Sequence, residues 1–560
     1  MSLSLFRRKN ISQAIKDAEV ENGEHSLAKI LTVKDLTFFG IAAIIGAGIF
    51  STIGRASFNG GPAVSLLFIF TAVACVFTAL SYAQFASTVP VSGSAYTYAY
   101  VTFGELFAWI IGWALVLEYA VSNMVVAISW SEYFVSMLEN IFRIHFPRWL
   151  AIDYGTAKAA FSEYLKASQS GEVAQLTENT NILARAYQDA PSFLGLKILF
   201  NLPAGLITTL ITWLIYIGIK ESRNASNILV IIKLAVIFLV IIGGVFYVRT
   251  ENWTPFAPNG AKGVLLSVAS VFFAFIGFDS ISTTAEECKD PQKDLPRAMI
   301  ITLIIVTILY VAITLVLTGM VNYAELQVND PLAYVFEKVN LNWFAGIISV
   351  SAVVAITSAL LAYQVGQPRI WMVMSRDGLL PKKFSKIHPK YKTPAFATII
   401  TGLFVGIPSM FMNMQFFIDL TSVGTFFAFI LVSGGILYMD RNGLSKDSKF
   451  KVPYINGKFI VLPALIIGLW WTHQNTDGIF AHFAEKPLIV VFWLSWLGLG
   501  IGSIKYNFSL LPILGILTNL YLMSELGWTN WAMFLGWLII GSVIYFIYGY
   551  KHSKLAKTKV

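Results

Sequence analysis

Two apolar stretches interrupted by glycine hold the residues best suited to binding a small molecule. They read GIAAIIGAGIF and AFIGFDSI, and each contains an Ile-Gly pair, Ile45-Gly46 and Ile276-Gly277. Glycine costs about 1 kcal/mol in a helix interior and permits backbone angles that other residues avoid. A helix that unwinds there exposes N–H groups toward one side and carbonyl oxygens toward the other, which complements the carboxylate and the ammonium of a zwitterion.

The positions of these stretches favour binding over packing. Small residues also let helices pack closely, and this is the alternative explanation for either motif alone. The two stretches lie in the first and sixth apolar segments of the chain, five segments apart. Interrupted segments at corresponding positions of two five-helix halves are the sequence sign of a transporter site built from inverted repeats.

The composition indicates a membrane protein. Of the 560 residues, 56% are hydrophobic and 13% are charged, whereas soluble proteins carry about 25% charged residues. These values exclude a disordered chain, a basic nucleic-acid-binding domain and an ordinary cytosolic enzyme. Apolar segments of about 20 residues are typical of spanning helices, whose backbone groups must all be satisfied internally. We therefore predict an all-α membrane protein with about fourteen transmembrane helices, near 36–57, 62–83, 104–138, 198–219, 228–248, 263–284, 298–321, 343–365, 395–412, 417–438, 458–472, 487–503, 509–523 and 530–549.

The distribution of Lys and Arg predicts the orientation in the membrane. With a cytoplasmic N-terminus, 28 of these residues fall on the cytoplasmic side and 4 in the short loops opposite. Positive charge favours the cytoplasmic side, so both termini are expected there. The net charge of +9 is then a signal of topology and of contact with membrane lipid, not of nucleic acid. The expected divisions are a cytoplasmic tail (1–35), a ten-helix core (36–440) with an extracytoplasmic loop (141–197), four additional transmembrane helices (441–550) and a second cytoplasmic tail (551–560).

The motifs of common enzymes are missing. The sequence has no Walker A loop, no Gly-x-Ser-x-Gly elbow and no His/Cys cluster with metal-binding spacing. We expect neither an enzyme nor a metal or cofactor. Cys75 and Cys288 have no sequence-local partner and predict no disulfide framework. The 141–197 loop is expected to be partly helical and to form a surface hairpin, with a small lid or a partner contact as the alternatives.

Among the charged residues inside apolar segments, three are candidates for function, because a charge within a span is costly. Lys233 lies in the fifth segment, and snorkelling of its side chain to the headgroups is the structural alternative. Glu118 lies near the middle of the third segment, where it could receive a cationic side chain or pair with Lys233, or else form a local pair with Asn123. Asp279 follows the second glycine break and could simply cap the half-helix after it.

Several of these stretches together resemble one family. The chain is similar to permeases of the amino acid–polyamine–organocation superfamily, and most similar to the cationic amino acid transporter family. The resemblance implies a core of ten helices in two inverted repeats (5+5), with discontinuous first and sixth helices. It is carried by GIAAIIGAGIF (40–50), PVSGSAYTYAYVTFGELFAW (90–109), SVFFAFIGFDSISTTAEECKDPQKDLPRA (270–298), MSRDGLLP (374–381) and LPILGILTNLYLM (511–523).

The resemblance also implies roles for the residues around the breaks. The substrate carboxylate would bind the N–H groups of Ala47 and Gly48, and the ammonium would meet carbonyls near Ile44, Phe273 and Ile276. Phe273 would cover the site as a gate, with Phe272 as the alternative register, while Tyr363 and Gln364 could line its far end. The expected substrate-binding residues are Ile44, Ile45, Gly46, Ala47, Gly48, Glu118, Phe273, Ile276 and Gly277.

The same resemblance implies proton coupling through Lys233 and Asp279. The lysine would occupy the place of sodium in sodium-coupled relatives and tie the first helix to the eighth, near Thr357 and Ser358. The expected function is secondary active transport of L-amino acids, cationic or small neutral, across the cell membrane by proton-coupled symport with alternating access. An amino acid exchanger, a polyamine carrier of the same fold and a non-transporting amino acid sensor are the alternatives.

Overall fold

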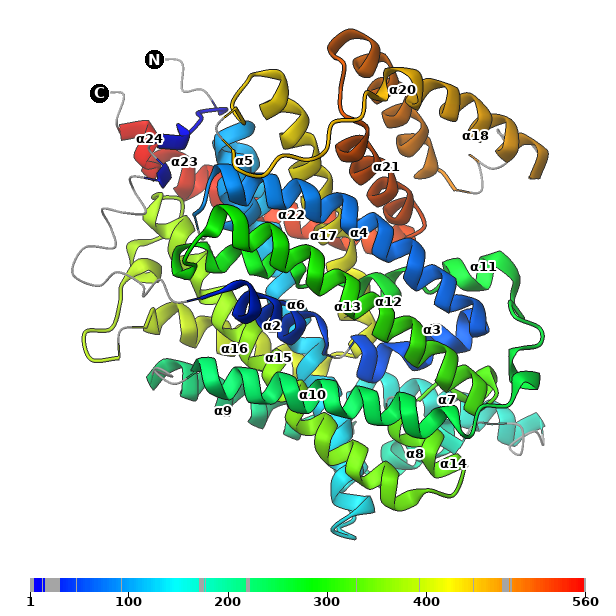
Figure 1. Cartoon of the computed structure of the whole chain (residues 1–560). Helices are drawn as coiled ribbons and strands as arrows, with labels where there is room; N and C mark the ends of the chain where they lie inside the picture. The colour runs from blue at the N-terminus through cyan, green and yellow to red at the C-terminus, as the bar shows by residue number, and fades with distance from the viewer. Residues whose placement is uncertain are drawn as a thin grey trace.

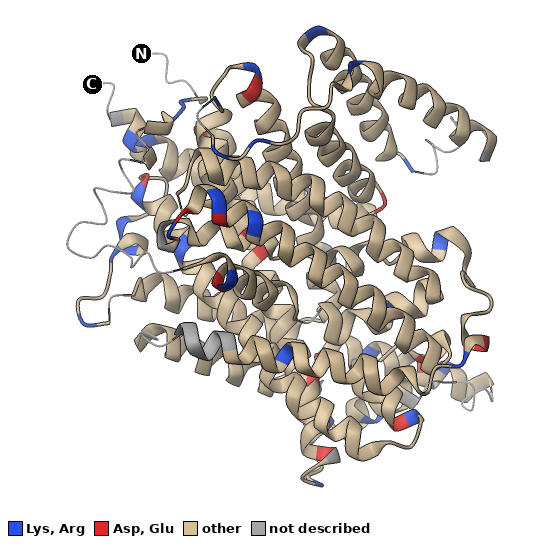
Figure 2. Ribbon diagram, viewed as in Figure 1, with Lys and Arg blue, Asp and Glu red and all other residues tan. Residues whose placement is uncertain are grey.

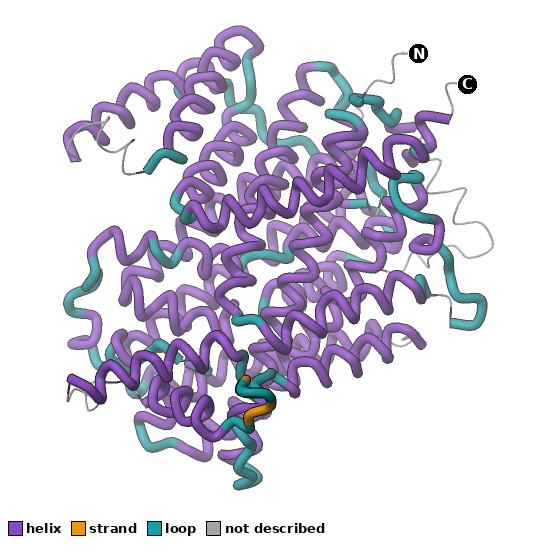
Figure 3. Tube along the Cα trace, turned by 180° about the vertical axis from the view of Figure 1, so that it is seen from behind, coloured by secondary structure: helices purple, strands orange, loops and turns teal. Residues whose placement is uncertain are grey.

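The protein is a body of long helices with both chain ends at the same end of the bundle (Figure 1). The computed structural model describes residues 5–12, 14–15, 31–46, 48–91, 93–170, 176, 178–217, 222–328, 330–391, 393–446, 448–475, 483 and 486–557. Within these ranges the only strands are a two-residue pair, β1 (Ser192–Phe193) and β2 (Leu196–Lys197), visible from behind in Figure 3. The prediction of a helical protein is confirmed.

The first half of the chain contains an interrupted helix and three long ones, α4, α6 and α10. Its elements are α2 (Val33–Ile44), η1 (Gly48–Thr52), α3 (Ile53–Gly60), η2 (Gly61–Ala63), α4 (Val64–Thr88), α5 (Ser94–Thr102), α6 (Glu105–Asn140), η3 (Arg148–Leu150), α7 (Tyr154–Ser170), α8 (Glu178–Asp189), α9 (Leu202–Ile217) and α10 (Ser222–Val245).

The middle of the chain repeats the pattern of one interrupted helix followed by long ones. Its elements are η5 (Thr250–Trp253), α11 (Gly260–Leu265), α12 (Val268–Phe273), η6 (Phe278–Glu287), α13 (Pro291–Met320), η7 (Tyr323–Glu325), α14 (Pro331–Lys338), α15 (Asn342–Arg376), η8 (Lys382–Ser385), α16 (Ala395–Phe411) and α17 (Met414–Arg441).

The last part adds further apolar helices. In Figure 1, α18 and α20 lie beside one another at one side of the body, and α20 also packs on α21, which packs on α17 and α4. The elements are η9 (Gly457–Phe459), α18 (Val461–Asn475), α20 (Ile489–Tyr506), α21 (Leu510–Ser524), α22 (Trp528–Ile544), η10 (Tyr545–Gly549), α23 (Tyr550–His552) and α24 (Lys554–Lys557).

Every one of the fourteen predicted apolar segments contains helix. Among the described residues, nine helices are long and apolar enough to cross a membrane, and three shorter apolar ones accompany them. The chain is therefore a multi-pass membrane protein. The number of spans and the repeat architecture stay predictions. Figure 2 shows charged residues mainly in loops and at helix ends, with few along the middle of the body.

Local sequence signals explain where the functional helices begin. The Asp35 carboxylate accepts the Thr32 N–H at 3.0 Å, which is half of a capping box and starts α2. Pro291 occupies the first turn of α13, where its missing N–H removes no helical bond. The Asn413 side chain accepts the Phe416 N–H at 2.7 Å and caps α17.

The two longest helices, α6 with 36 residues and α15 with 35, pack along each other in the centre. On the other side of α6, α22 is fastened by tryptophans. Trp113 and Trp537 stack with ring centroids 4.5 Å apart. The indole N–H of each donates to the backbone carbonyl of the other at 2.9 Å. This reciprocal pair fixes the last apolar helix against the central one, because each ring satisfies its polar edge while burying its face.

Both cysteines are buried and free, as the sequence predicted. Burial raises the pKa of the Cys288 thiol to about 11, and the neighbouring Asp294 carboxylate acts in the same direction. The Cys288 thiol is therefore protonated and unreactive at neutral pH.

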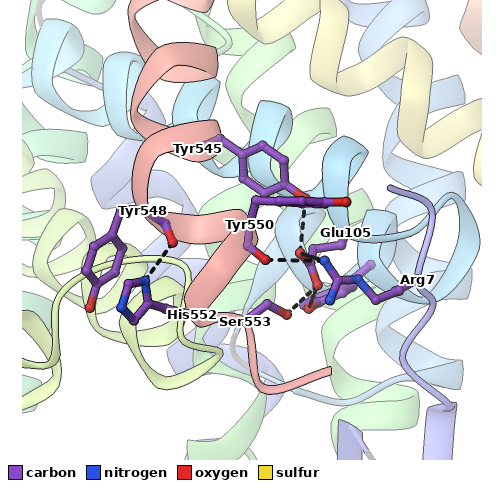
Figure 4. Close-up of polar contacts among 8 residues, drawn as sticks. Arg7, Glu105, Tyr545, Tyr548, Tyr550, His552 and Ser553 are labelled. Atoms are coloured by element: carbon purple, nitrogen blue, oxygen red, sulfur yellow. Dashed lines mark hydrogen bonds and ion pairs between the residues drawn. The ribbon is translucent and has the colours of Figure 1, made fainter. Parts of the chain in front are cut away.

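Both chain ends meet at one buried carboxylate, that of Glu105 at the start of α6 (Figure 4). Its oxygens accept hydrogen bonds from Arg7 at 3.3 Å, from the Tyr545 hydroxyl at 3.0 Å and from the Ser553 hydroxyl at 2.5 Å. The Tyr100 hydroxyl donates to it at 3.0 Å. Glu105 is completely buried, so these donors replace the water that its charge would otherwise require.

A second carboxylate fastens the same chain ends to α15. Asp377, directly after α15, forms an ion pair with Lys9 at 3.1 Å and accepts the Tyr96 hydroxyl at 2.7 Å. Its backbone carbonyl accepts the Lys554 N–H at 3.0 Å. We call the two sets of contacts, around Glu105 and around Asp377, the tail clasp. It holds both tails against the ends of the two central helices.

Replacing Glu105 with Ala is expected to lower the stability of the folded protein. The substitution leaves the buried Arg7 without its counter-charge, which costs about 3–5 kcal/mol in comparable buried pairs. The measurement is the thermal unfolding midpoint of the purified protein in detergent. Glu163→Ala, at an exposed position of α7, is the control and should unfold like the wild type. Equal midpoints for the two variants would show that the tail clasp contributes nothing to stability.

Candidate functional site

The first interrupted helix loses its regular winding at the predicted glycines. The N–H of Ile45 still donates to the Ile41 carbonyl at 3.0 Å, but Ile45 itself is extended, with φ −77° and ψ 92°. Winding resumes in the π-helical turn η1, where the N–H groups of Ile49 and Phe50 both donate to the Gly46 carbonyl at 3.2 Å. Ile45 and Gly46, which follow α2, are therefore not helical. Ala47, the predicted carboxylate ligand, lies outside the described residues.

The second interrupted helix breaks at Gly277. Winding ends after α12, and Gly277 takes φ +118°, a left-handed conformation that residues with a side chain rarely adopt. The 3-10 helix η6 begins directly after it, and the Ser280 N–H donates to the Gly277 carbonyl at 3.1 Å. Both glycine motifs therefore interrupt helices, and the prediction of two discontinuous helices is confirmed for these segments.

The two breaks lie against each other. A methyl group added at Gly48 would come within 2.7 Å of the Ala274 Cβ, so α12 and η1 approach as closely as glycine allows. A methyl group at Gly277 would lie 3.1 Å from the Ala43 carbonyl oxygen at the end of α2. Each break is thus packed against the end of the other helix. Close packing of helices by small residues is the alternative explanation of the glycine motifs. Here the glycines allow both the close packing and the unwinding.

Tyrosines from neighbouring helices cap the carbonyls that the breaks expose. The Tyr310 hydroxyl on α13 is 3.1 Å from the Ile44 carbonyl and 2.9 Å from the Ala274 carbonyl, so it bridges both breaks. The Tyr363 hydroxyl on α15 donates to the Ile276 carbonyl at 3.1 Å. The predicted ammonium ligands Ile44 and Ile276 therefore already accept protein donors. A carbonyl oxygen has two lone pairs and can accept a second donor.

Lys233 completes the capping of α2. Its ammonium donates to the Ala42 carbonyl at 3.1 Å, and the side chain is completely buried. The snorkelling alternative is therefore wrong, because the lysine points inward to the first interrupted helix. No hydrogen bond joins Lys233 to Thr357 or Ser358 among the described residues; these hydroxyls donate to carbonyls of their own helix, α15. A cation at the C-terminal end of a helix is stabilising, because the free carbonyls there carry partial negative charge.

Three phenylalanines lie in or just after α12, and two of them make ring contacts with neighbouring helices. Phe272 stacks on Phe426 of α17 with ring centroids 3.7 Å apart. Phe275 contacts the ring of Tyr310 at 5.4 Å. Phe273 has no ring contact with the described residues and is buried beside the break. This assignment favours Phe273 over Phe272 as the gate.

Glu118 and Asp279 lie within electrostatic range of each other and are both buried. Glu118 hydrogen-bonds with Thr425 of α17 and forms no ion pair with Lys233 within the described part of the chain. The local pair with Asn123 is also wrong, because the Asn123 amide donates to Gln364. Backbone N–H groups of Gly277, Asp279 and Ser280 lie near the Asp279 carboxylate, but neither of its oxygens has a hydrogen-bond partner among the described residues, and no side-chain cap forms at the start of η6. No described side chain donates to it.

Three tyrosines surround these two carboxyl groups. Tyr82, Tyr119 and Tyr363 each lie within electrostatic range of both Glu118 and Asp279. The hydroxyls of Tyr82 and Tyr119 are buried and have no hydrogen-bond partner among the described residues. Sequence reasoning missed Tyr310, Tyr82 and Tyr119, because a tyrosine in an apolar helix gives no signal of which neighbour its hydroxyl reaches.

The arrangement can bind a small polar molecule but offers no metal site or catalytic set. Backbone N–H and carbonyl groups at two helix breaks are fixed by surrounding side chains, and two carboxyl groups lie nearby. Within the described ranges, no group of three or more His, Cys, Asp and Glu residues could hold a metal ion. This geometry suits recognition by fixed dipoles.

Comparisons with known proteins agree with this geometry. Residues 31–492 match the family model described as "Amino acid permease", and residues 509–553 match the model for the C-terminus of that family. The chain belongs to the amino acid permease family. Within the amino acid–polyamine–organocation superfamily, this permease is close to the cationic amino acid transporters. It is a transporter and not an enzyme, as the sequence predicted.

Three relatives cover almost the whole permease. The branched-chain amino acid permease BcaP of Bacillus subtilis is 38% identical over 99% of this chain and 100% of its own. The methylthioribose transporter of the same organism is 36% identical over 99% and 100%. The vacuolar cationic amino acid transporter 2 of Arabidopsis thaliana is 31% identical over 99% of this chain and 93% of its own.

Gly48→Ala is expected to reduce uptake of radiolabelled amino acid by proteoliposomes at least tenfold. The added methyl group must push α12 away from η1, and such overpacking costs about 1–3 kcal/mol in a close-packed core. Gly536→Ala is the matched control, because nothing lies within 4 Å of the methyl group that it adds. Wild-type uptake by the Gly48 variant would show that the close approach of the two helices is not needed for transport.

Tyr310→Phe is expected to slow uptake without preventing folding. The variant keeps the ring and its packing but leaves the Ile44 and Ala274 carbonyls without their shared donor, a loss of about 1–3 kcal/mol. Initial uptake rates and the thermal unfolding midpoint should be measured together. Tyr247→Phe, at a residue with 39% of its surface exposed, is the control. Unchanged uptake rates for Tyr310→Phe would show that the Tyr310 hydroxyl is not needed for transport.

Proposed function

We propose that this permease carries L-amino acids across the cell membrane by proton-coupled symport with alternating access. The observation that carries the proposal is the contact of the two helix breaks, at Gly48 with Ala274 and at Gly277 with Ala43. The substrate carboxylate would bind the N–H groups of Ala47 and Gly48, and the substrate ammonium would bind carbonyls at Ile44, Phe273 and Ile276. The ammonium can share the Ile44 and Ile276 carbonyls with the tyrosine hydroxyls or displace them.

The proposed substrates have cationic or small neutral side chains. The printed names of the relatives include branched-chain and cationic amino acids. Glu118 and Asp279 could receive a cationic side chain, and Phe273 an apolar one. Methylthioribose, named for the second relative, belongs in the substrate panel as a non-amino-acid control.

Proton coupling is proposed to act through Lys233 and Asp279. When Lys233 is protonated, its charge and its hydrogen bond to the Ala42 carbonyl would hold the end of α2 in place. Loss of the proton removes the charge and weakens the hydrogen bond, because a neutral amine is a weaker donor, and this would free α2 to move toward an open form. Asp279 begins the half-helix η6, so a change in its charge would act on the second break in the same way.

The proposed architecture places the transport path in residues 36–440, as two inverted repeats of five helices. The four additional helices would span 441–550, and both termini would face the cytoplasm. The location of both chain ends at one end of the bundle supports this orientation (Figure 1). The Lys and Arg residues of the cytoplasmic face would contact anionic membrane lipid.

Uptake into proteoliposomes should test the function and the coupling together. The panel contains labelled L-arginine, L-lysine, L-alanine, L-leucine and methylthioribose, each with and without an inward proton gradient. With the wild type, the proton gradient is expected to drive accumulation of at least one amino acid of the panel inside the vesicles. Lys233→Ala should abolish this accumulation, whereas Lys262→Ala, at an exposed lysine, should behave as the wild type.

Other outcomes would support the alternatives. Counterflow without any response to the gradient would indicate an exchanger, and binding without uptake a sensor. Accumulation of labelled putrescine in place of amino acids would indicate a polyamine carrier. Gradient-driven uptake by Lys233→Ala equal to that of the wild type would contradict the role of Lys233.

A further inference from the structure

The segment between α6 and α9 folds into a small packed unit at the end of the bundle opposite the chain ends (Figure 1). Its helices α7 and α8 bury a core of their own around Ile152, Ala157 and Ala186. The Phe200 N–H donates to the Trp149 carbonyl at 3.2 Å within this segment. The end of the segment is fastened to the body, because the Asn201 N–H donates to the Met410 carbonyl of α16 at 2.8 Å. The prediction of a partly helical loop is confirmed.

This unit and the end of α6 line a cavity of about 370 Å³ that is open to the surface. Small-molecule sites commonly have about 300–1,000 Å³. The wall combines both signs of charge with an aromatic ring: its ionisable members and its indole are Glu139, His145, Arg148, Trp149, Arg185 and Asp189.

The two arginines of the wall differ in their partners. Arg148 forms an ion pair with Glu139 at 2.5 Å and is an electrostatic neighbour of Asp330, just before α14. Its charge is therefore committed to the protein. Arg185 on α8 forms no ion pair or hydrogen bond with the described residues, although Asp189 lies one turn away on the same helix. The cavity thus presents one uncommitted guanidinium and one uncommitted carboxylate a helical turn apart.

We infer that this cavity is a second binding site for a free amino acid, separate from the helix breaks. Arg185 binds the carboxylate in the forked geometry that a guanidinium favours. Asp189 binds the ammonium, and the Trp149 ring contacts the side chain. The inference rests on the proposed function, because the cavity would bind the same amino acid substrate before that substrate reaches the central site.

The position along α6 supports a receiving role. Glu139 of the cavity and Glu118 of the central site are 21 residues apart on one continuous helix, a separation of about 32 Å at 1.5 Å per residue. The two sites cannot share one ligand. The cavity lies at one face of the protein and would concentrate substrate only there. Binding at the cavity should therefore change the KM for transport from that face and not from the opposite one.

The test compares Arg185→Ala with Lys166→Ala, which removes an exposed cation of α7 outside the cavity. Proteoliposomes in which the protein has one orientation receive labelled L-leucine or L-arginine either outside or inside the vesicles, so that transport from each face is measured separately. Arg185→Ala should raise the KM for uptake from the cavity side about three- to tenfold, as loss of one exposed charged contact does. The maximal rate and the KM from the opposite side should be unchanged. Lys166→Ala should match the wild type.

Equilibrium binding of the same two labelled amino acids to the full-length protein in nanodiscs gives a second readout. The wild type should bind two per chain and Arg185→Ala one. Gly48→Ala should lose uptake but keep the binding that depends on Arg185. Equal KM values and equal stoichiometry for Arg185→Ala and Lys166→Ala would overturn the inference. Absence of any amino acid uptake by the wild type would instead overturn the proposed function.

Discussion

The close approach of two interrupted helices at Gly48 and Ala274 is the constraint on which the rest of the site depends. Only a residue without a side chain lets the η1 turn reach the backbone of α12 at this distance. Two broken helices in a membrane would otherwise expose N–H and carbonyl groups that lipid cannot satisfy. Because the breaks face each other, these groups lie inside the protein, where fixed side chains and a polar ligand can satisfy them.

The helices around the breaks supply these side chains, and each does so from a different direction. Lys233 comes from α10, Tyr310 from α13 and Tyr363 from α15, and each donates to a carbonyl next to a break. A buried carbonyl without a donor costs several kcal/mol in hydrocarbon. The three donors therefore stabilise the unwound form and also link it to three helices that do not unwind. Movement of either break must rearrange at least one of these contacts.

The sequence predicted the backbone features of the site better than its side-chain contacts. Glycine at positions 46, 48 and 277 signals unwinding through its own conformational freedom, and both breaks occur where expected. The charge on Lys233 marked it as functional, but its true partner, the Ala42 carbonyl, depends on how α10 packs on α2. The partners of Glu118 were also wrong, because helix rotation decides which residues face each other and no single sequence records it. Tyr310 gave no signal at all, since its helix reads as uniformly apolar.

The tail clasp has a consequence for the order of assembly. Glu105 accepts the Tyr545 hydroxyl from 440 residues further along the chain and the Ser553 hydroxyl from 448 residues further. A ribosome must finish almost the whole polypeptide before these hydrogen bonds can form. Until then only Arg7 and Tyr100, both made before α6, can contact the Glu105 carboxylate, so the set of donors around it is completed only when the last-made residues return to the start of the chain.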